Sequence, residues 1–125
     1  MSAWPVEVIP DESSVYMRLH RVTWIRDGAV IPGAFGNIGS GMSCDWAKYS
    51  TPAETCSRSQ RHPASEYAAV SMHVGSVRKI STQTVDHDPV AHNRAHSEIR
   101  GVKDAETRLR LRRIAIMVSE DLTTE

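Results

Sequence analysis

The alternation of apolar and polar residues in two segments constrains the fold of this chain most. Within residues 15–25, apolar side chains occupy every second position from Val15 to Leu19, and residues 67–74 repeat the pattern up to Val74. Because successive side chains of a strand point to opposite faces, this period of two predicts two half-buried strands. They in turn predict a sheet with one apolar face.

Turn signals divide other parts of the chain into further short strands. Asp27-Gly28 is a two-residue hairpin signal, and residues 29–31 follow it as the return strand. Residues 42–46 form a short buried strand or a turn. Gly75-Ser76 bends the chain before a segment that continues the preceding strand or pairs back with it. The later strand candidates are residues 77–80, 82–85 and 95–102.

Two helices are predicted from their first residues. In Thr51-Pro52-Ala53-Glu54 the threonine can cap a helix, the proline suits its first position, and the glutamate can reach back to the cap amide. This helix should run to about Arg61, because Pro63 ends it. Asp104 can cap a final helix that extends through Met117.

The predicted strands outnumber the helices, and their order is not the regular alternation of parallel α/β folds. We therefore expect an α+β fold, with a mainly antiparallel sheet and two or three short helices. A chain of 125 residues suits one compact domain. We expect this domain at 15–118, between an N-terminal arm at 1–14 and a tail at 119–125.

Composition limits the classes of partner. Basic and acidic residues balance at 15 each, which argues against nucleic-acid binding through bulk charge but leaves a local basic patch open. No stretch approaches the ~20 apolar residues that span a bilayer, and the N-terminus lacks a secretion-signal pattern. We expect a cytoplasmic protein with no membrane partner. Cys44 and Cys56 form no CxxC pair and are expected to be reduced thiols.

Residues 85–101 are the most promising place for a binding or reaction site. They bring together titratable and hydrogen-bonding side chains at a density unusual for a solvated loop: His87, His92, Asn93, Arg94, His96 and Glu98. In a helix, His92 and His96 would share a face and could bind a metal, with His87 or Glu98 as a third ligand. His96 falls within the strand expected at 95–102, where His92 and His96 would not share a helix face. We therefore assign no metal site.

His96 is the candidate for acid–base chemistry within this segment. Asn93 and Arg94 precede it at the edge of a predicted strand and can orient its ring. An imidazole held in this way can exchange protons near neutral pH. The alternative is a histidine whose nitrogens only hold the turn together.

The first predicted strand supplies basic residues on both of its faces. Arg18 and His20 share one face, whereas Arg21 lies on the side of Met17 and Leu19. A core-side arginine needs an anionic partner. Arg21 is therefore expected in a buried ion pair or in a clamp for a phosphate or carboxylate.

The glycine-rich residues 33–41 match no phosphate-binding fingerprint, and we expect them to form a loop beside the site. Ser43 follows this loop without the strand–turn–helix context of a nucleophile elbow. It is expected to be a polar site residue and not a covalent nucleophile.

Five short motifs in this chain resemble those of a group of small bacterial proteins with no assigned activity. They are Leu19-His20-Arg21-Val22, Ala34-Phe35, Ser43-Cys44-Asp45, Thr51-Pro52-Ala53-Glu54 and Asn93-Arg94-Ala95-His96. The resemblance covers most of residues 15–117. It implies a shared fold and a shared polar site, and it implies no activity.

A looser resemblance concerns the order of three residues. An early Arg or His on a strand, a middle Ser and a late Glu on a strand are similar to the order in ADP-ribosyltransferase-like folds. Arg21, Ser43 and Glu98 would fill these places. The chain departs from that group in its small size and in the histidine beside Glu98.

The expected function is a site for an anionic ligand, either a nucleotide or a phosphorylated small molecule, because arginine and histidine are the available donors. Catalysis, as a transferase or hydrolase, would use His96, Glu98, Arg21 and Ser43. Ligand binding would use Asn93, Arg94, Arg18 and His20. The alternative is a non-catalytic interaction module, as a subunit of a larger assembly or as an oligomer, marked by an exposed apolar patch at Trp4, Trp24 or Trp46. No cofactor is assigned.

Overall fold

The structure, a computed structural model, describes residues 4–118, so the predicted tail at 119–125 lies outside the described residues. The elements follow one another in this order: β1 (Ser14–His20), α1 (Arg21–Trp24), β2 (Ile25–Arg26), β3 (Ala29–Val30), the 3-10 helix η1 (Pro32–Ala34), β4 (Met42–Trp46), α2 (Pro52–Ser57), the 3-10 helix η2 (Ala64–Glu66), β5 (Tyr67–His73), α3 (Val74–Arg78), β6 (Thr84–His87), β7 (His96–Arg100), α4 (Ala105–Ile114) and β8 (Ile116–Met117).

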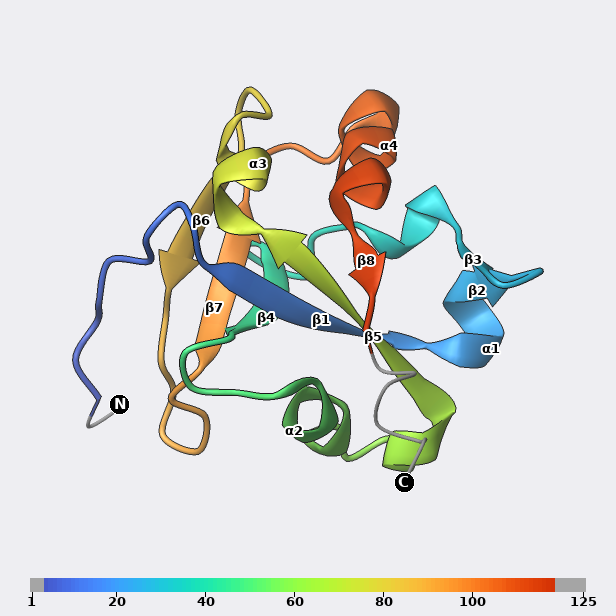
Figure 1. Cartoon of the computed structure of the whole chain (residues 1–125), viewed down its shortest axis with the longest axis horizontal. Coiled ribbons are helices and arrows are strands. Elements are labelled where there is room, and N and C mark those ends of the chain that lie inside the picture. The colour runs from blue at the N-terminus through green and yellow to red at the C-terminus, as the bar shows by residue number, and fades with distance from the viewer. Residues whose placement is uncertain (1–3, 119–125) are drawn as a thin grey trace.

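Six strands form one sheet in the order β6-β7-β4-β1-β5-β8, and every neighbouring pair is antiparallel. β2 and β3 form a separate hairpin. Within residues 4–118, α3 and α4 lie on one side of the sheet and α2 lies on the other (Figure 1). The predicted α+β fold with a mainly antiparallel sheet is confirmed.

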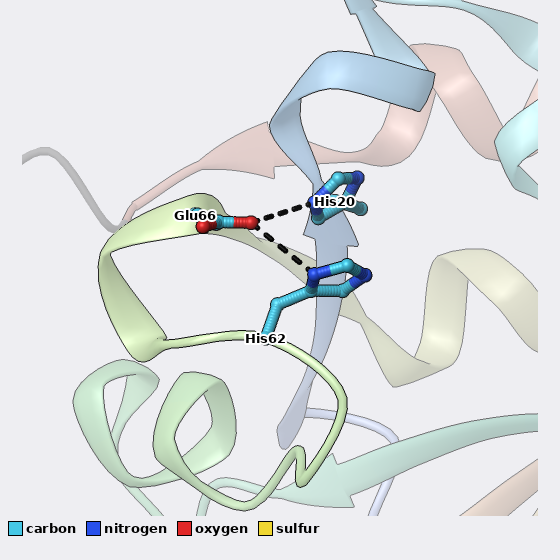
Figure 2. Close-up of side chains that lie close together, drawn as sticks. All are labelled: His20, His62 and Glu66. Atoms are coloured by element: carbon cyan, nitrogen blue, oxygen red, sulfur yellow. Dashed lines mark hydrogen bonds and ion pairs between the residues drawn. The ribbon is translucent and has the colours of Figure 1, made fainter.

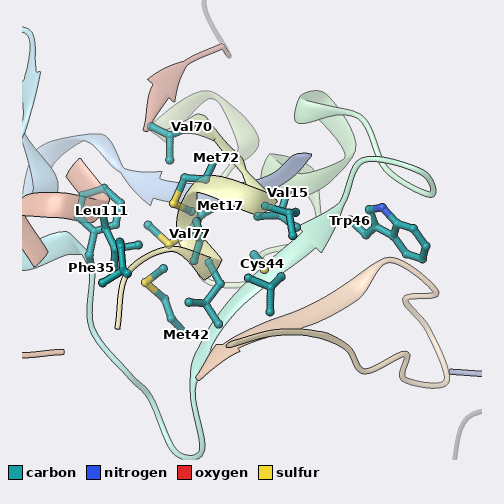
Figure 3. Packing of buried hydrophobic residues seen from close by; sticks show 14 of the residues in the cluster. Val15, Met17, Phe35, Met42, Cys44, Trp46, Val70, Met72, Val77 and Leu111 are labelled. Carbon is teal, nitrogen blue, oxygen red and sulfur yellow. The ribbon is translucent and has the colours of Figure 1, made fainter. Parts of the chain in front are cut away.

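The apolar face of the sheet packs beneath α3 and α4. The alternate β1 residues Val15, Met17 and Leu19 are buried, as their period of two predicts. They join one core cluster with Val77 of α3 and Leu111 of α4 (Figure 3). Burying an aliphatic side chain of this size contributes about 1.5–3 kcal/mol, so this layer is a main source of stability.

The opposite face of the sheet is polar. Arg18 and His20 of β1 point toward it, and the strand register continues the row of polar side chains across the sheet. Tyr16 pairs with Asp45 of β4, and Asp45 pairs with His96 of β7. On this face α2 packs on β1 and β5.

The first strand is shorter than predicted. β1 ends at His20, which pairs with Tyr67, the first residue of β5, so no partner strand continues the ladder. The chain turns into α1 instead, and His20 Nδ1 lies 3.2 Å from Thr23 Oγ1 across this turn. The hairpin after it is confirmed, with positive φ at both Asp27 and Gly28, as a type I′ turn requires.

The segment after Gly75 is a helix and not a strand. In α3 the apolar residues Val74 and Val77 are three apart and both are buried, which is a helical spacing. His73 precedes this helix, and its Nδ1 accepts the backbone N–H of Ser76 at 3.2 Å. The prediction that residues 77–80 form a strand is therefore wrong.

Three later boundaries also differ from the predictions. β6 covers 84–87 and not 82–85, because Thr82 has a φ of 77° that does not suit a strand. β7 ends before Gly101, whose φ is 127°. The final helix ends at Ile114, and the next residues become β8, which hydrogen-bonds the edge of β5 that would otherwise lack a partner.

The predicted capping box at the start of α2 is confirmed. Glu54 N–H donates to Thr51 Oγ1 at 3.1 Å, and Thr51 N–H donates to Glu54 Oε1 at 2.9 Å. The helix ends at Ser57, four residues before the predicted Arg61. At that end Ser57 Oγ donates to the Glu54 carbonyl at 2.9 Å, a local bond that competes with helix continuation.

The capping box gives a first prediction. Thr51→Ala should lower the free energy of unfolding by about 1 kcal/mol, because Glu54 N–H loses its acceptor at the exposed helix start. Thr51→Ser keeps the oxygen and should stay close to wild type. Urea unfolding of the three proteins measures the difference, and equal midpoints for Thr51→Ala and wild type would contradict the cap.

The segment before β1 packs on the folded chain. Ile9 is buried in the core, and the Glu7 carboxylate accepts from Lys48 Nζ at 2.8 Å and from the Tyr49 hydroxyl. These two hydrogen bonds lower the pKa of Glu7. Within the described residues, no helix has the length and apolar character needed to cross a membrane.

Candidate functional site

A cleft of about 720 Å³ lies on the polar face of the sheet. Small-molecule sites typically measure about 300–1,000 Å³, so the size suits a ligand such as a nucleotide. β1 and β4 form its floor. Residues 33–38 and 90–96 border it, as does the end of α2 with the residues that follow. Its ionisable lining is mostly basic: Arg18, Arg58, Arg61, Arg108, His20, His92, His96 and a single aspartate, Asp45.

Asp45 holds the walls of the cleft together. It is 4% exposed and accepts three hydrogen bonds, from Thr55 Oγ1 at 2.8 Å, from Arg58 Nη1 at 2.6 Å and from Asn93 Nδ2 at 2.9 Å. Asn93 Oδ1 in turn accepts the backbone N–H of Ala95 at 3.0 Å. One carboxylate thus ties α2, the residue after it and the segment before β7 to strand β4.

Ser43, His96 and Glu98 form a second polar group at the cleft. The register places Ser43 directly opposite Glu98, and both Ser43 Oγ and His96 Nε2 lie 3.4 Å from Glu98 Oε2. Glu98 is 7% exposed, and its other oxygen, Oε1, has no hydrogen-bond partner among the described residues. A Cβ added at Gly41 would lie 2.6 Å from that oxygen, so the glycine makes room for the carboxyl group.

The hydrogen bonds of His96 decide where its protons lie. Nδ1 lies 2.8 Å from the carbonyl oxygen of Asp88, which can only accept, so Nδ1 carries a proton. The second ring nitrogen, Nε2, faces Glu98 Oε2 at 3.4 Å, so the imidazole joins the Asp88 carbonyl to the carboxyl group of Glu98.

Several cleft cations have no acidic partner within residues 4–118. Arg18 donates from Nη1 to the carbonyl of Thr55 at 3.3 Å, and its guanidinium lies 5.9 Å from the centre of the Tyr67 ring. Neither Arg18 nor Arg61 forms a salt bridge with a described residue, and the buried Nε of Arg108 has no hydrogen-bond partner there. The cleft thus offers positive charge that nothing in the described chain neutralises.

Glu98 reaches the cleft only through its contacts with Ser43 and His96, and two further predicted site residues lie away from it. Arg21 does not share the core side of β1, because it belongs to α1, where its Nε donates to the carbonyl of Tyr67 at 3.1 Å. Arg94 lies on the arm side: its guanidinium is 4.1 Å from the centre of the Tyr49 ring and 4.8 Å from that of Trp4. The prediction for Arg21 assumes that it belongs to the first strand, and the prediction for Arg94 assumes a turn that points its side chain toward His96. The chain adopts neither geometry.

The helical histidine pair does not form. Val90 and Asn93 bridge a tight turn, so His92 and His96 do not share a helix face. His87 has both ring nitrogens occupied, since Nδ1 accepts Glu7 N–H at 3.0 Å and Nε2 donates to the carbonyl of Arg94 at 2.7 Å. His87 therefore holds the segment before β1 and the segment before β7 together.

Sequence reasoning missed Asp45, Arg58 and Arg61. Asp45 stands two residues after Ser43, so the alternation of β4 could have placed it on the same face. Arg58 and Arg61 follow α2, and their approach to the cleft depends on how that helix packs on the sheet. No local pattern gives this packing.

Neither thiol adds to the chemistry of the cleft. Cys44 and Cys56 are both buried. Burial raises the pKa of each thiol, which disfavours the thiolate needed for nucleophilic or redox chemistry.

Comparison of the chain with protein-family models, with curated proteins and with solved structures finds no match. The function is therefore inferred from the residues of the cleft.

Proposed function

We propose that this protein binds an anionic small molecule, a nucleotide or another phosphorylated compound, in the cleft on the polar face of its sheet. The observation that carries the proposal is the charge of the lining, with four arginines and one carboxylate. That carboxylate, on Asp45, is already paired with Arg58. Arginine binds phosphate oxygens through two parallel hydrogen bonds, so the remaining guanidinium groups suit a phosphorylated ligand.

We further propose that the site is catalytic, as a transferase or hydrolase. Glu98 Oε2 lies 3.4 Å from His96 Nε2, and Ser43 contributes a hydroxyl to the same carboxyl group. In this proposal Glu98 and His96 exchange a proton with the ligand, while Ser43 positions the carboxyl group. Arg18 on β1, which lines the cleft, is the basic residue of this proposal, because Arg21 does not line it.

The alternative is a non-catalytic interaction module. It is supported by exposed apolar side chains before β1, where Val6 and Val8 are 72% and 87% exposed. Trp4 is also exposed, at 41%, whereas Trp46 is buried and Trp24 is half-buried, so of the three tryptophans only Trp4 lies in an exposed apolar patch. We favour the cleft because its lining combines positive charge that is unpaired within the described chain with a volume that suits a ligand.

Isothermal titration calorimetry with ADP and adenosine tests ligand binding. ADP should bind and adenosine should bind at least about 10-fold more weakly, because only ADP offers phosphate oxygens to the arginines. Arg18→Gln and Arg61→Gln should each weaken ADP binding about 10-fold or more, the effect of losing a charged hydrogen bond. Arg26→Gln, on the hairpin outside the cleft, is the matched control and should bind as wild type does. Equal affinities for ADP and adenosine, or equal losses in all three variants, would contradict the proposal.

His96→Ala separates a functional from a structural histidine. If His96 serves the ligand, the variant should lose ADP binding or turnover, while its free energy of unfolding should fall by only about 1 kcal/mol, the contribution of its hydrogen bond to the Asp88 carbonyl. A histidine that only holds the turn would give the reverse, lower stability with full binding by the folded protein. Thermal melts and ADP titration of this variant distinguish the two results.

A further inference from the structure

Three metal-ligand side chains meet at one end of the cleft, apart from the Ser43–His96–Glu98 group. His20 is the last residue of β1, His62 lies in the loop after α2, and Glu66 ends η2 (Figure 2). His20 Nε2 and His62 Nδ1 both point at the same oxygen, Oε1 of Glu66, and each lies 3.2 Å from it. Ligand-type atoms of all three residues lie within 4.8 Å of one another.

The spacing of these atoms fits a tetrahedral metal. Zinc bonds of about 2.0–2.1 Å to nitrogen and oxygen place neighbouring ligand atoms about 3.3–3.4 Å apart. The two measured nitrogen–oxygen distances are 3.2 Å, which is close to that value. An ion could therefore replace these two contacts with small side-chain movements.

Contacts around the three residues hold them near this arrangement. Thr23 Oγ1 lies 3.2 Å from Nδ1 of His20, which leaves Nε2 directed at Glu66. Such a partner on the second ring nitrogen is typical of metal-binding histidines. The rings of His20 and His62 stack with centres 4.1 Å apart, and Tyr67 packs its edge against both.

We propose that His20, His62 and Glu66 bind one divalent transition-metal ion, with zinc as the best fit. Two imidazoles and a carboxylate suit zinc, and three protein ligands leave a fourth position for water or a substrate atom. Calcium and magnesium fit less well because they prefer sets of oxygen ligands. The site does not depend on the anionic ligand proposed above, so either can exist without the other.

A second cluster, Asp88, His96 and Glu98, is the rival location. There the two carboxylates face opposite nitrogens of one imidazole: Asp88 Oδ2 is 3.7 Å from Nδ1, and Glu98 Oε2 is 3.4 Å from Nε2. One ion bound to one nitrogen cannot draw both carboxylates together without turning the ring. That cluster is therefore the weaker site.

Titration of the purified, chelator-treated protein with Zn²⁺ and with Co²⁺ tests the proposal. Calorimetry gives the zinc stoichiometry and affinity, and the visible absorption of Co²⁺ reports tetrahedral coordination. We expect one ion per chain. His62→Ala and Glu66→Gln should each weaken zinc binding at least about 10-fold, since even outer contacts of metal sites change affinity by 10–100-fold. Both residues are exposed, so the variants should fold, and circular dichroism checks this.

Asp88→Asn is the matched control, and it should bind zinc as wild type does. Wild-type protein that binds no zinc at micromolar concentration would overturn the proposal. Binding lost in Asp88→Asn but kept in His62→Ala and Glu66→Gln would overturn it in favour of the rival cluster. Binding that none of the variants changes would place the ion elsewhere and would also overturn it.

Discussion

Gly101→Ala should leave the chain largely unfolded. Gly101 has a φ of 127°, which residues with a Cβ rarely adopt, and an added Cβ would lie 2.0 Å from the carbonyl oxygen of Thr82. That contact is with backbone, so no side-chain rotation relieves it. The segment between β7 and α4 would have to move away from Thr82, which precedes β6. We expect a loss above about 4 kcal/mol, an exceptional value for one substitution.

Gly28→Ala is the matched control for this prediction. Gly28 also has a positive φ, 79°, but an added Cβ would meet no atom within 4 Å. Its loss should be about 1 kcal/mol, from backbone strain alone. Thermal and urea unfolding followed by circular dichroism compare the two variants. Similar losses in both would show that the close approach of Gly101 to Thr82 is not a constraint on the fold.

Asp45→Ala should cost about 3–5 kcal/mol, the typical result of removing one partner of a buried ion pair. The change leaves Arg58, Asn93 and Thr55 without the acceptor that they share. Asp45→Asn retains the shape and one carbonyl acceptor, so its loss should be smaller. Asp45→Ala should also weaken ADP binding, because it releases both α2 and the segment before β7, which form the walls of the cleft.

An exposed ion pair provides the contrast. Glu106 accepts from Arg110 at 2.8 Å on the outer face of α4, and both side chains are mostly exposed. Glu106→Ala should change stability by less than about 1 kcal/mol, because water screens such pairs. Urea unfolding of Asp45→Ala, Asp45→Asn and Glu106→Ala measures the order. Equal stabilities for Asp45→Ala and Glu106→Ala would contradict the role given to Asp45.

The sequence predicts those parts of the fold that depend on local pattern. Alternation locates β1 and β5, the Asp27-Gly28 pair locates the hairpin, and the Thr51–Glu54 motif locates α2. The ends of these elements depend on distant partners. β1 stops where β5 begins, and the residues after α4 become β8 because β5 has a free edge. Neither cause is visible in the local sequence.

Local pattern and long-range packing also explain which residues of the candidate site the sequence predicts. Of the residues that the sequence predicts for the site, Ser43, Asn93 and His96 line one cleft, and Glu98 contacts Ser43 and His96. Arg21 is not where the alternation predicts it, because β1 ends at His20 and Arg21 begins α1. The contribution of Asp45 depends on α2 and residues 90–95 meeting over β4, which is a long-range event.

The most direct measurement of the central claim is a crystal structure of the protein with ADP at saturating concentration. We expect the diphosphate in the cleft, with its oxygens within hydrogen-bond distance of Arg18, Arg61 or Arg108. We also expect the reacting part of the ligand to lie near His96 and Glu98. ADP bound elsewhere on the surface with the cleft empty, or no bound ADP at all, would contradict the account.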